Sequence, residues 1–433
     1  MTAVGIEAIN VFGGTAYVNL EELAVHRGLA RDRFTNLLMK EKTVVLHNED
    51  PVTFAVNAAR PIVDRLTPEE KDRIELLVIC SESGIDFAKS MSTYVHKHLH
   101  LNRNCRLFEL KQACYSGTAG LQMALSFILS QASPGAKALV VASDICRVVL
   151  PPGVDLAGGG KSAAQADASA LTSDWSFAEP STGAGAVAVL VSEHPHVFQI
   201  DVGANGYYGY EVMDVCRPFP DGDAGNADLS LLSYLDCCEN AFREYRSRVG
   251  GVDYAGSFHY LAFHTPFGGM VKGAHRSMMR KFTAAKPNEI EEDFVRRVTP
   301  GMIHCQRVGN IMGGTVLMSL ASTIEHADMS AARRIGCFSY GSGCCSEFYS
   351  GVAREAGQRV VRGFGISSSL DARRRLTMDE YDSVLRTAEV VRFGTANVTL
   401  DESRLRVKPP PPQKPRLFLR AIDNFHREYE WAA

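Results

Sequence analysis

The stretch KQACYSGTAG, residues 111–120, places one cysteine, Cys114, directly before small residues that allow close approach to the backbone. A helical pattern begins near Gly117, so the thiol would lie at the amino end of a helix. The positive end of a helix dipole favours the thiolate, which is the nucleophilic form of cysteine. The small residues would leave room for an acyl group on a long arm. The stretch therefore favours a nucleophilic Cys114, although a buried structural cysteine fits the same residues.

A nucleophilic thiol needs a base and a place where negative charge can develop. His264 closes the apolar run YLAFHT and precedes Pro and Gly. At a strand end above a sheet it would be well placed for chemistry, while a satisfied core histidine is the alternative. Glu82 follows the apolar run ELLVIC, where loss of water would raise its pKa and make it a usable base near neutrality. A glutamate at a helix N-terminus is the alternative.

Two turns could stabilise a developing negative charge. RVGNIMGG offers the Asn310 side chain, and SYGSG offers the backbone N–H groups around Ser342. Gly341 and Gly343 are equally consistent with an ordinary tight turn. Eight other histidines are expected on a solvated helix face or in polar surface contexts: His96, His98, His100, His194, His196, His275, His326 and His426.

The elements that would position these residues alternate along the chain. Continuous apolar, β-branched runs predict strands covered on both faces at 75–80, 138–143, 185–192, 260–265 and 334–343. The helical pattern at 118–132 is apolar nearly all round and is expected to be buried, whereas the pattern at 229–249 is more amphipathic. Strands that alternate with helices predict an α/β protein. Similar strand ends in the two halves weakly indicate a duplicated unit.

The composition is that of a globular protein without a strong charge bias. Of the 433 residues, 45% are hydrophobic and 22% are charged, and the formal net charge is −3. This balance argues against nucleic-acid or membrane-surface binding by the fold as a whole. The N-terminus does not read as a signal peptide, and no apolar stretch reaches the ~18 residues of a membrane span. Eleven cysteines without a CxxC pair or zinc-ligand spacing predict reduced thiols, no metal site and a cytoplasmic protein.

Taken in order, the motifs resemble the 3-hydroxy-3-methylglutaryl-CoA synthases of the thiolase superfamily. The resemblance covers nearly the whole chain, and the ordered Glu, Cys and His set is highly specific. The residues that carry it are Glu82 in SESGID, Cys114 in ACYSGTAG, Asp144 in ASDI, Asp214 in VMDVCRP, His264 in FHTPF, Asn310 in RVGN and Gly341-Ser342-Gly343 in SYGSG.

The resemblance implies a homodimer with a thiolase-like five-layer α/β/α/β/α fold built from two duplicated halves. The N-terminal half, 1–175, would carry Glu82 and Cys114. The C-terminal half, 176–433, would carry His264, Asn310 and the GSG turn, and would include the proline-rich segment VKPPPPQKP.

Several strings differ from the primary-metabolism enzyme of this family. The chain has KQACYSG where that enzyme usually has Asn-Ala-Cys-Tyr-Gly-Gly, and HTPFGGMVKG where coenzyme A users carry a bulkier segment with a lysine closer to the histidine. Its opening, GIEAINVFGGTAYVNLEELAVHRGL, and the string RFTNLLMKEK look like the synthases of bacterial polyketide β-branching cassettes, which act on acyl carrier proteins.

The resemblance also implies the chemistry. Cys114 would take acetyl from a donor acyl carrier protein, and Glu82 would deprotonate its methyl group. The enolate, held by the N–H groups of Cys114 and Ser342, would attack the β-ketone on an acceptor carrier protein, and water would then release the product from Cys114. His264 would orient the ketone and protonate the alkoxide, and Asn310 would help to hold the thioester. Further site residues implied are Tyr115 and Gly341, with Asp86, Asp144 and Asp214 in support.

No bound cofactor is implied, because the substrates are carried on the phosphopantetheine of the carrier proteins. Carrier proteins are usually acidic around that group, so the docking surface should be basic. The candidates, each also consistent with an ordinary solvated charge, are Arg33, Lys40, Lys42, Lys272 and Arg276.

Three other functions stay open at this stage. They are the coenzyme A-using synthase of primary metabolism, a decarboxylating ketoacyl synthase, and an inactive homologue that only docks carrier proteins. The KQACYSG string and the glycines after His264 count against the first. A ketoacyl synthase would not need Glu82, and an inactive homologue would not need the complete Glu, Cys and His set.

Overall fold

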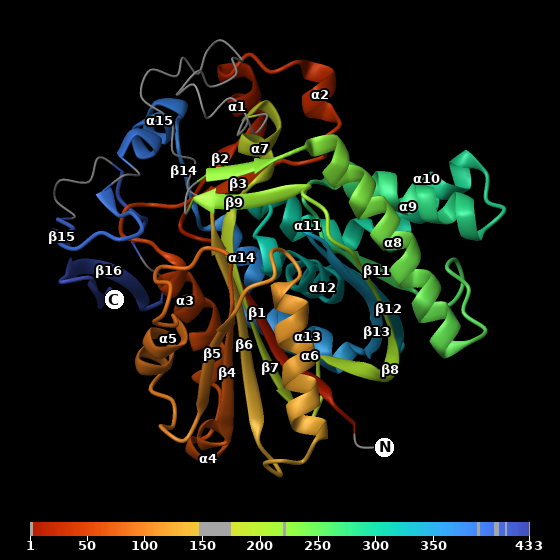
Figure 1. Ribbon diagram of the computed structural model, residues 1–433, viewed down its shortest axis with the longest axis horizontal. Coiled ribbons are helices and arrows are strands. Elements are labelled where there is room, and N and C mark those ends of the chain that lie inside the picture. The colour runs from red at the N-terminus through yellow and green to blue at the C-terminus, as the bar shows by residue number, and fades with distance from the viewer. Residues whose placement is uncertain are drawn as a thin grey trace.

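The computed structural model describes residues 3–146, 175–219, 222–387, 390–401, 407–411 and 414–432. Its centre is a nine-stranded sheet in the order β11-β12-β13-β8-β1-β7-β6-β4-β5 (Figure 1). In chain order these strands are β1 (Gly5–Phe12), β4 (Ile74–Cys80), β5 (Arg106–Leu110), β6 (Lys137–Ile145), β7 (Ala184–Ser192), β8 (Phe198–Gly209), β11 (Tyr260–Phe263), β12 (Arg333–Gly341) and β13 (Cys345–Ala353).

The sheet repeats one pairing pattern. From β1 outward, β7 and β6 follow in antiparallel pairs, and β4 and β5 continue in parallel pairs. From β8 outward, β13 and β12 follow in antiparallel pairs, and β11 continues in a parallel pair. The two sets meet where β1 pairs with β8. The repeat confirms the predicted duplication.

The position of the division between the halves is a separate question. The strand β7 lies on the C-terminal side of the predicted division at 175/176, yet it pairs with β1 and β6 of the first set. We propose that the halves divide at 193–197, between β7 and β8.

Helices form three layers around the two strand sets (Figure 1). Helices α6 (Ser116–Leu129) and α12 (Thr315–His326) contact each other, and α6 packs on β4, β6 and β7 while α12 packs on β11 and β12. On the outer side, α3 (Pro51–Val63) covers β1, β6 and β7, and α8 (Ala227–Val249) covers β8, β12 and β13. The result is the predicted five-layer α/β/α/β/α, thiolase-like fold.

Local signals explain where the outer helices begin and end. Asp50 caps α3 by accepting a hydrogen bond from the Thr53 N–H, and Pro51 occupies the first turn, where a missing N–H costs nothing. Asn226 caps α8 by accepting from the Leu229 N–H. That helix ends at Gly250, whose φ of 68° suits glycine.

The predicted strands and helices are confirmed as β4, β6, β7, β11 and β12 and as α6 and α8. One expectation for α6 is wrong, because the helix is not buried all round. Met123 is 45% exposed and Leu129 is 38% exposed, so α6 presents an apolar face to solvent in the single chain.

Shorter elements surround this body. The small sheets comprise β2 (Ala16–Asn19), β3 (Glu41–Val44) and β14 (Arg374–Arg375); β9 (Val215–Phe219) and β10 (Gly222–Gly225); and β15 (Val398–Thr399), β16 (Arg416–Asp423) and β17 (His426–Ala432). The further helices are α1 (Leu20–His26), α2 (Arg31–Thr35), α4 (Pro68–Asp72), α5 (Ser92–Leu99), α7 (Trp175–Ser181), α9 (Gly268–Phe282), α10 (Pro287–Arg297), α11 (Thr299–Val308), α13 (Glu355–Phe364), α14 (Ile366–Asp371) and α15 (Met378–Thr387), with a 3₁₀ turn at Met312–Gly314. In the part of the chain that the structure describes, no helix has the length and apolar character needed to cross a bilayer.

The surface prediction for His275 is wrong. Its side chain is fully buried, with Nε2 3.0 Å from Asp293 Oδ1 and Nδ1 3.2 Å from the Tyr254 hydroxyl. Val271, Ala274 and Met278 are buried on the same helix, so the helical period carries His275 inward with them.

Candidate active site

The carboxyl ends of β4 and β6 lie next to each other and carry two acidic residues. Asp144, near the end of β6, is fully buried, and its Oδ1 accepts from the Glu82 N–H at 2.8 Å and the Ser83 N–H at 3.1 Å. The hydroxyls of Ser81 and Ser83 donate to the same oxygen at 3.0 and 2.9 Å. Asp144 therefore fixes the loop that carries Glu82, which is the supporting role expected of it.

Glu82 faces an arginine from the β9–β10 hairpin. Arg217 Nη2 lies 3.0 Å from Glu82 Oε1, and Arg217 Nη1 donates to the Glu82 backbone carbonyl at 3.2 Å. Arg217 Nε also contacts Asp223 Oδ1 at 2.6 Å. Burial raises the pKa of Glu82 to about 7, although Arg217 acts in the opposite direction. Glu82 can therefore exchange a proton near neutral pH.

Cys114 lies in a tight turn before α6. The Tyr115 N–H donates to the Gln112 carbonyl at 3.0 Å, and Ala113 between them has a φ of 42°, which is uncommon for a residue with a side chain. Burial raises the pKa of the Cys114 thiol well above its ordinary value, and the Glu82 and Asp144 carboxylates add to this effect. The environment thus favours the thiol, and the expectation of a thiolate held by the helix dipole is wrong for this structure. The thiol must lose its proton as it reacts.

The GSG turn after β12 packs directly on the Cys114 turn. A Cβ on Gly341 would lie 2.6 Å from the Tyr115 nitrogen and 2.7 Å from the Gln112 oxygen. Asp214, fully buried, holds the turn by accepting from the Gly343 N–H at 2.9 Å and from the Tyr340 hydroxyl. Among the described residues, the N–H groups of Cys114 and Ser342 have no partner, so both can serve an oxyanion.

We expect the Gly341→Ala variant to load acetyl on Cys114 at least about tenfold more slowly and to melt earlier, because the new Cβ must push the Cys114 turn away. Stopped-time intact mass spectrometry and thermal unfolding measure the two effects. Gly273→Ala in α9 is the matched control, since nothing lies within 4 Å of its added Cβ. Unchanged loading by Gly341→Ala would show that the contact between the turns is not needed.

His264 follows β11 at the same edge of the sheet as the GSG turn. Its backbone N–H donates to the Phe338 carbonyl at 2.7 Å, and its carbonyl accepts from the Tyr234 hydroxyl at 2.6 Å. The ring is almost fully buried, and burial lowers its pKa to about 3, so the imidazole is neutral. A neutral ring can orient a carbonyl through an N–H group but does not supply a positive charge.

The Asn310 loop packs on the start of α6. A Cβ on Gly117 would lie 2.1 Å from the Gly313 oxygen, which shows how closely the two segments approach. Asn310 Oδ1 accepts from the Met312 N–H at 3.0 Å and the Thr315 hydroxyl at 2.9 Å. The carbonyl side of the amide is therefore used by its own loop, and the NH₂ group is the part that can bind a ligand.

Two predicted site residues have different surroundings. The Tyr115 hydroxyl donates to Glu347 Oε2 at 2.7 Å, so it is engaged with a buried carboxylate on β13. Burial raises the pKa of Glu347 to about 7. Asp86 is exposed and accepts from the N–H groups of Ala88 and Lys89 at 2.7 Å. Asp86 therefore stabilises a surface turn, and within the described part of the chain no hydrogen bond or ion pair joins it to the site.

The residues predicted to dock carrier proteins also differ in their surroundings. Lys42 is buried, and its Nζ donates to the Glu179 carbonyl at 2.5 Å, so its place on a docking surface is wrong. Lys40 and Arg276 are exposed, and Lys272 Nζ pairs with Glu291 at 2.6 Å. The Arg33 side chain lies outside the described residues.

The chain segments of these candidates are close together. The Gly269 N–H at the start of α9 donates to the Leu37 carbonyl, and a Cβ on Gly269 would lie 2.0 Å from the Asn36 oxygen. The loop before Lys40 therefore borders the helix that begins four residues after His264.

Comparison with known proteins adds two family matches. Residues 1–166 match the model described as hydroxymethylglutaryl-coenzyme A synthase N terminal, and residues 280–431 match the one described as hydroxymethylglutaryl-coenzyme A synthase C terminal. The chain belongs to the hydroxymethylglutaryl-CoA synthase family. This membership agrees with the resemblance found in the sequence.

Individual relatives extend over the same length. The polyketide biosynthesis 3-hydroxy-3-methylglutaryl-ACP synthase PksG of Bacillus subtilis (strain 168) is 62% identical over 432 residues, 100% of both chains. The hydroxymethylglutaryl-CoA synthase of Enterococcus faecalis is 31% identical and covers 88% of this chain and 91% of its own. The structure of the curacin biosynthetic pathway HMG synthase in complex with holo donor-ACP aligns with a TM-score of 0.92 and 60% identity over 99% of this chain and 100% of that one.

Among the described residues, one group outside this site has side chains of the types that bind metal ions. It comprises His304, Glu325 and His326, between α11 and the end of α12. His304 Nε2 is 2.7 Å from Glu325 Oε2, and the Ser367 hydroxyl donates to the other oxygen at 2.7 Å. His304 and Glu325 pair with each other, His304 Nδ1 is buried without a hydrogen-bond partner among the described residues, and none of the three side chains belongs to the site around Cys114.

Arg217 and Glu347 were missed by the reasoning from sequence. Arg217 lies three residues after Asp214 in VMDVCRP, so the motif that carried Asp214 contained the signal. Glu347 follows the GSG turn in CCSEFYS, where a lone carboxylate inside an apolar strand was the available sign.

Arg217 should set the pH dependence of this synthase. Because the base must be ionised, condensation from preformed acetyl-enzyme should rise with pH and level off above about 7, following the raised pKa of Glu82. Arg217→Gln removes a cation that lowers this pKa, so the midpoint should move about one unit to higher pH. Single-turnover rates between about pH 5.5 and 9 measure the shift. Arg217→Lys keeps the positive charge, so the midpoint of its pH profile should stay near that of the parent. An unchanged or lower midpoint in Arg217→Gln would show that Arg217 does not lower the pKa of Glu82.

Proposed function

We propose that this protein is a 3-hydroxy-3-methylglutaryl-acyl-carrier-protein synthase of polyketide β-branching. The observation that carries the proposal is the 62% identity over 100% of the chain to PksG, a 3-hydroxy-3-methylglutaryl-ACP synthase. The solved curacin pathway HMG synthase with bound donor-ACP supports a carrier protein as partner. The arrangement of Glu82, Cys114 and the two free N–H groups supports the chemistry.

The reaction begins with acyl transfer to Cys114. The sulfur attacks the acetyl thioester of the donor carrier protein, and the thiol proton leaves with the phosphopantetheine sulfur. The tetrahedral oxyanion is stabilised by the N–H groups of Cys114 and Ser342. Since the resting group is a thiol, the proton leaves during the attack and not before it.

Condensation follows on the acetyl-enzyme. The Glu82 carboxylate removes a proton from the acetyl methyl group, and the enolate oxygen takes the place of the earlier oxyanion. The enolate carbon then attacks the β-ketone of an acetoacetyl-type group on the acceptor carrier protein. His264, as a neutral imidazole, orients that ketone through an N–H group and passes its proton to the new alkoxide, and the ring regains a proton as Glu82 gives up the one it took from the methyl group, so both residues return to their starting forms. The amide NH₂ of Asn310 helps to hold the acceptor thioester.

Hydrolysis completes the cycle. Water attacks the Cys114 thioester, which releases a free carboxylate and restores the thiol. The product is a 3-hydroxy-3-methylglutaryl-type group on the acceptor carrier protein. The chain's own donors and carboxylates supply each proton transfer in this sequence.

We propose a homodimer that works in the cytoplasm. The edge strand β5 pairs only with β4 within the described sheet, and the exposed apolar face of α6 contacts β5. An open strand edge beside exposed Met123 and Leu129 is suited to a second copy of the chain. All eleven cysteines are free, as expected for a reducing compartment.

Carrier docking is proposed on the basic surface around Lys40 and Arg276. Reversing both charges, Lys40→Glu with Arg276→Glu, should raise the KM for the carrier protein about tenfold and leave the kcat nearly unchanged. Steady-state kinetics at low and high salt measure this, because electrostatic docking weakens with salt. The control is Lys97→Glu, an exposed lysine on α5. A lower kcat at unchanged KM would contradict a docking role.

The test of the function is intact-protein mass spectrometry after mixing with acetyl-carrier protein or with acetyl-CoA. Rapid gain of one acetyl group from the carrier, with little from coenzyme A, is the expected result. Equal or faster loading from coenzyme A would indicate the primary-metabolism reaction. No loading from either acetyl donor would indicate an inactive homologue that only docks carrier proteins.

A further inference from the structure

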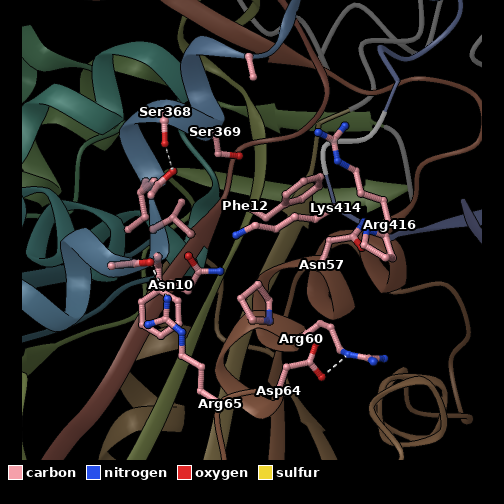
Figure 2. A pocket seen from close by; sticks show the side chains of 18 of the residues that line it. Asn10, Phe12, Asn57, Arg60, Asp64, Arg65, Ser368, Ser369, Lys414 and Arg416 are labelled. Carbon is pink, nitrogen blue, oxygen red and sulfur yellow. Dashed lines mark hydrogen bonds and ion pairs between the residues drawn. The ribbon is translucent and has the colours of Figure 1, made fainter. Parts of the chain in front are cut away.

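A cavity lies away from Cys114, on the outer side of the first strand set. Its volume is about 750 Å³, which is in the range of small-molecule sites. The wall is built from the end of β1, the C-terminal half of α3, the start of α14 and the β16–β17 hairpin (Figure 2). None of the site residues discussed above lines it.

The cavity is strongly basic. Four basic side chains, Arg60, Arg65, Lys414 and Arg416, and one carboxylate, Asp64, line it. Arg60 is paired with Asp64, as the dashed line in Figure 2 shows. Arg65 donates to the Gly363 carbonyl and lies 3.8 Å from the centre of the Phe364 ring. Among the described residues, Arg65, Lys414 and Arg416 therefore have no carboxylate in hydrogen-bond contact, and of these three Arg65 is already engaged with a carbonyl and an aromatic ring.

Arg416 is unusual among these cations. Its Nη1 is buried and has no hydrogen-bond partner among the described residues, and burial lowers the pKa of the guanidinium. The carboxylate of Glu49 attracts it, but that carboxylate already accepts from Thr15 at 2.7 Å and from the Leu46 N–H at 2.9 Å. A buried guanidinium nitrogen without a partner is costly, and an anion would remove that cost.

The backbone around Arg416 is fixed in advance. The neighbouring Leu417 exchanges two hydrogen bonds with the Asn57 side chain of α3, at 2.9 and 3.1 Å. The strand is also paired with β17, where Leu417 lies opposite Trp431. Lys414, two residues earlier, extends into the cavity past Phe12 in Figure 2. Arg416 is thus presented beside apolar walls at the start of a paired hairpin, which is a preorganised arrangement, whereas Lys414 lies in the exposed segment before it.

We propose that this cavity binds an organic phosphate. The phosphate would be held by the guanidinium of Arg416, which matches a phosphate fork geometrically, and by the Lys414 ammonium as a point charge. The organic part would rest against the aromatic and aliphatic walls supplied by Phe12, Ile366 and Trp431. The site is independent of the acyl-transfer reaction.

The chain supplies its own reporter for the test. It has two tryptophans, Trp175 and Trp431, and Trp431 lines the cavity. In a Trp175→Phe background, the remaining fluorescence comes from Trp431. Phenyl phosphate and inorganic pyrophosphate are titrated at constant ionic strength, and ³¹P NMR line broadening with the unsubstituted protein gives a second readout. We expect saturable binding by both methods.

Matched variants test whether the phosphate binds in this cavity. Arg416→Gln and Lys414→Gln should each raise the Kd for phenyl phosphate at least about tenfold. Arg420→Gln on the same strand should leave it unchanged, because Arg420 is exposed, paired with Glu428 and outside the cavity. No binding, or equal binding by all variants, would overturn the proposal. If succinate bound as tightly as phenyl phosphate, the cavity would not select phosphate over carboxylate, and the assigned ligand class would be wrong. Acetyl loading of Cys114 should be the same in all three variants.

Discussion

We expect the Cys114→Ala variant to gain no acetyl group from acetyl-carrier protein and to form no branched product. The Cys114 sulfur accepts the acetyl group and carries it during condensation. Its removal therefore ends acyl transfer and leaves no acetyl-enzyme to condense. The loss should be at least about 10⁴-fold in turnover, because removing the nucleophile of a coupled site removes most of its rate enhancement. Intact mass spectrometry and product analysis by liquid chromatography measure the two steps.

The control for this variant is Cys105→Ala. Cys105 is another half-buried thiol whose pKa burial raises to about 11, but it precedes β5 at the end opposite to the Glu82 edge. It should load acetyl at the parent rate. If Cys114→Ala were acetylated as fast as the parent, another nucleophile would have to carry the acyl group.

The fold was predictable where apolar residues run without interruption. The strands β4, β6 and β7 have this pattern and were found from sequence alone. The strand β13 was not, because CSEFYSGVA mixes serines and a glutamate into a strand that is nonetheless buried. Ser346, Glu347 and Ser350 are satisfied by residues far along the chain, as Glu347 is by Tyr115. Such tertiary pairing leaves no periodic signal in the sequence.

The site was predictable in its residues but less so in its electrostatics. The motif order located Glu82, Cys114 and His264, and the raised pKa of Glu82 follows from its place after a buried strand. The pKa of Cys114 did not follow the helix dipole, because burial and two carboxylates outweigh a partial charge. Arg217 is 135 residues from Glu82 in the chain, so only the folded hairpin shows the pair.

Sequence proximity also misled in two places. Asp86 is close to Glu82 in the chain, but the loop turns outward and Asp86 stabilises an exposed turn. Lys42 was expected on the surface with Lys40, yet the β3 strand buries it beside the Tyr381 ring. Both faces of β3 are covered, since Lys42, Thr43 and Val44 are all buried, so the alternation of side chains along a strand could not have placed Lys42.

We expect the Glu82→Gln variant to load acetyl on Cys114 at nearly the parent rate but to condense about 10²- to 10⁴-fold more slowly. The amide keeps the size and the contact with Arg217 but cannot accept the methyl proton. The acetyl-enzyme should therefore accumulate and decay only by hydrolysis. Mass spectrometry of the enzyme and of the acceptor carrier protein, sampled in one reaction, separates loading from condensation.

Glu75→Gln is the matched control, because Glu75 lies on β4 at the end opposite to the loop that carries Glu82, and the Ser133 hydroxyl is its partner there. It should condense normally, which would exclude a general effect of neutralising a carboxylate on β4. If Glu82→Gln also condensed at the parent rate, the base would have to be another carboxylate of the site. Asp144 would be one candidate, because four donors occupy its Oδ1 but its Oδ2 is buried without a hydrogen-bond partner among the described residues. Asp223, which shares Arg217 with Glu82, would be the other.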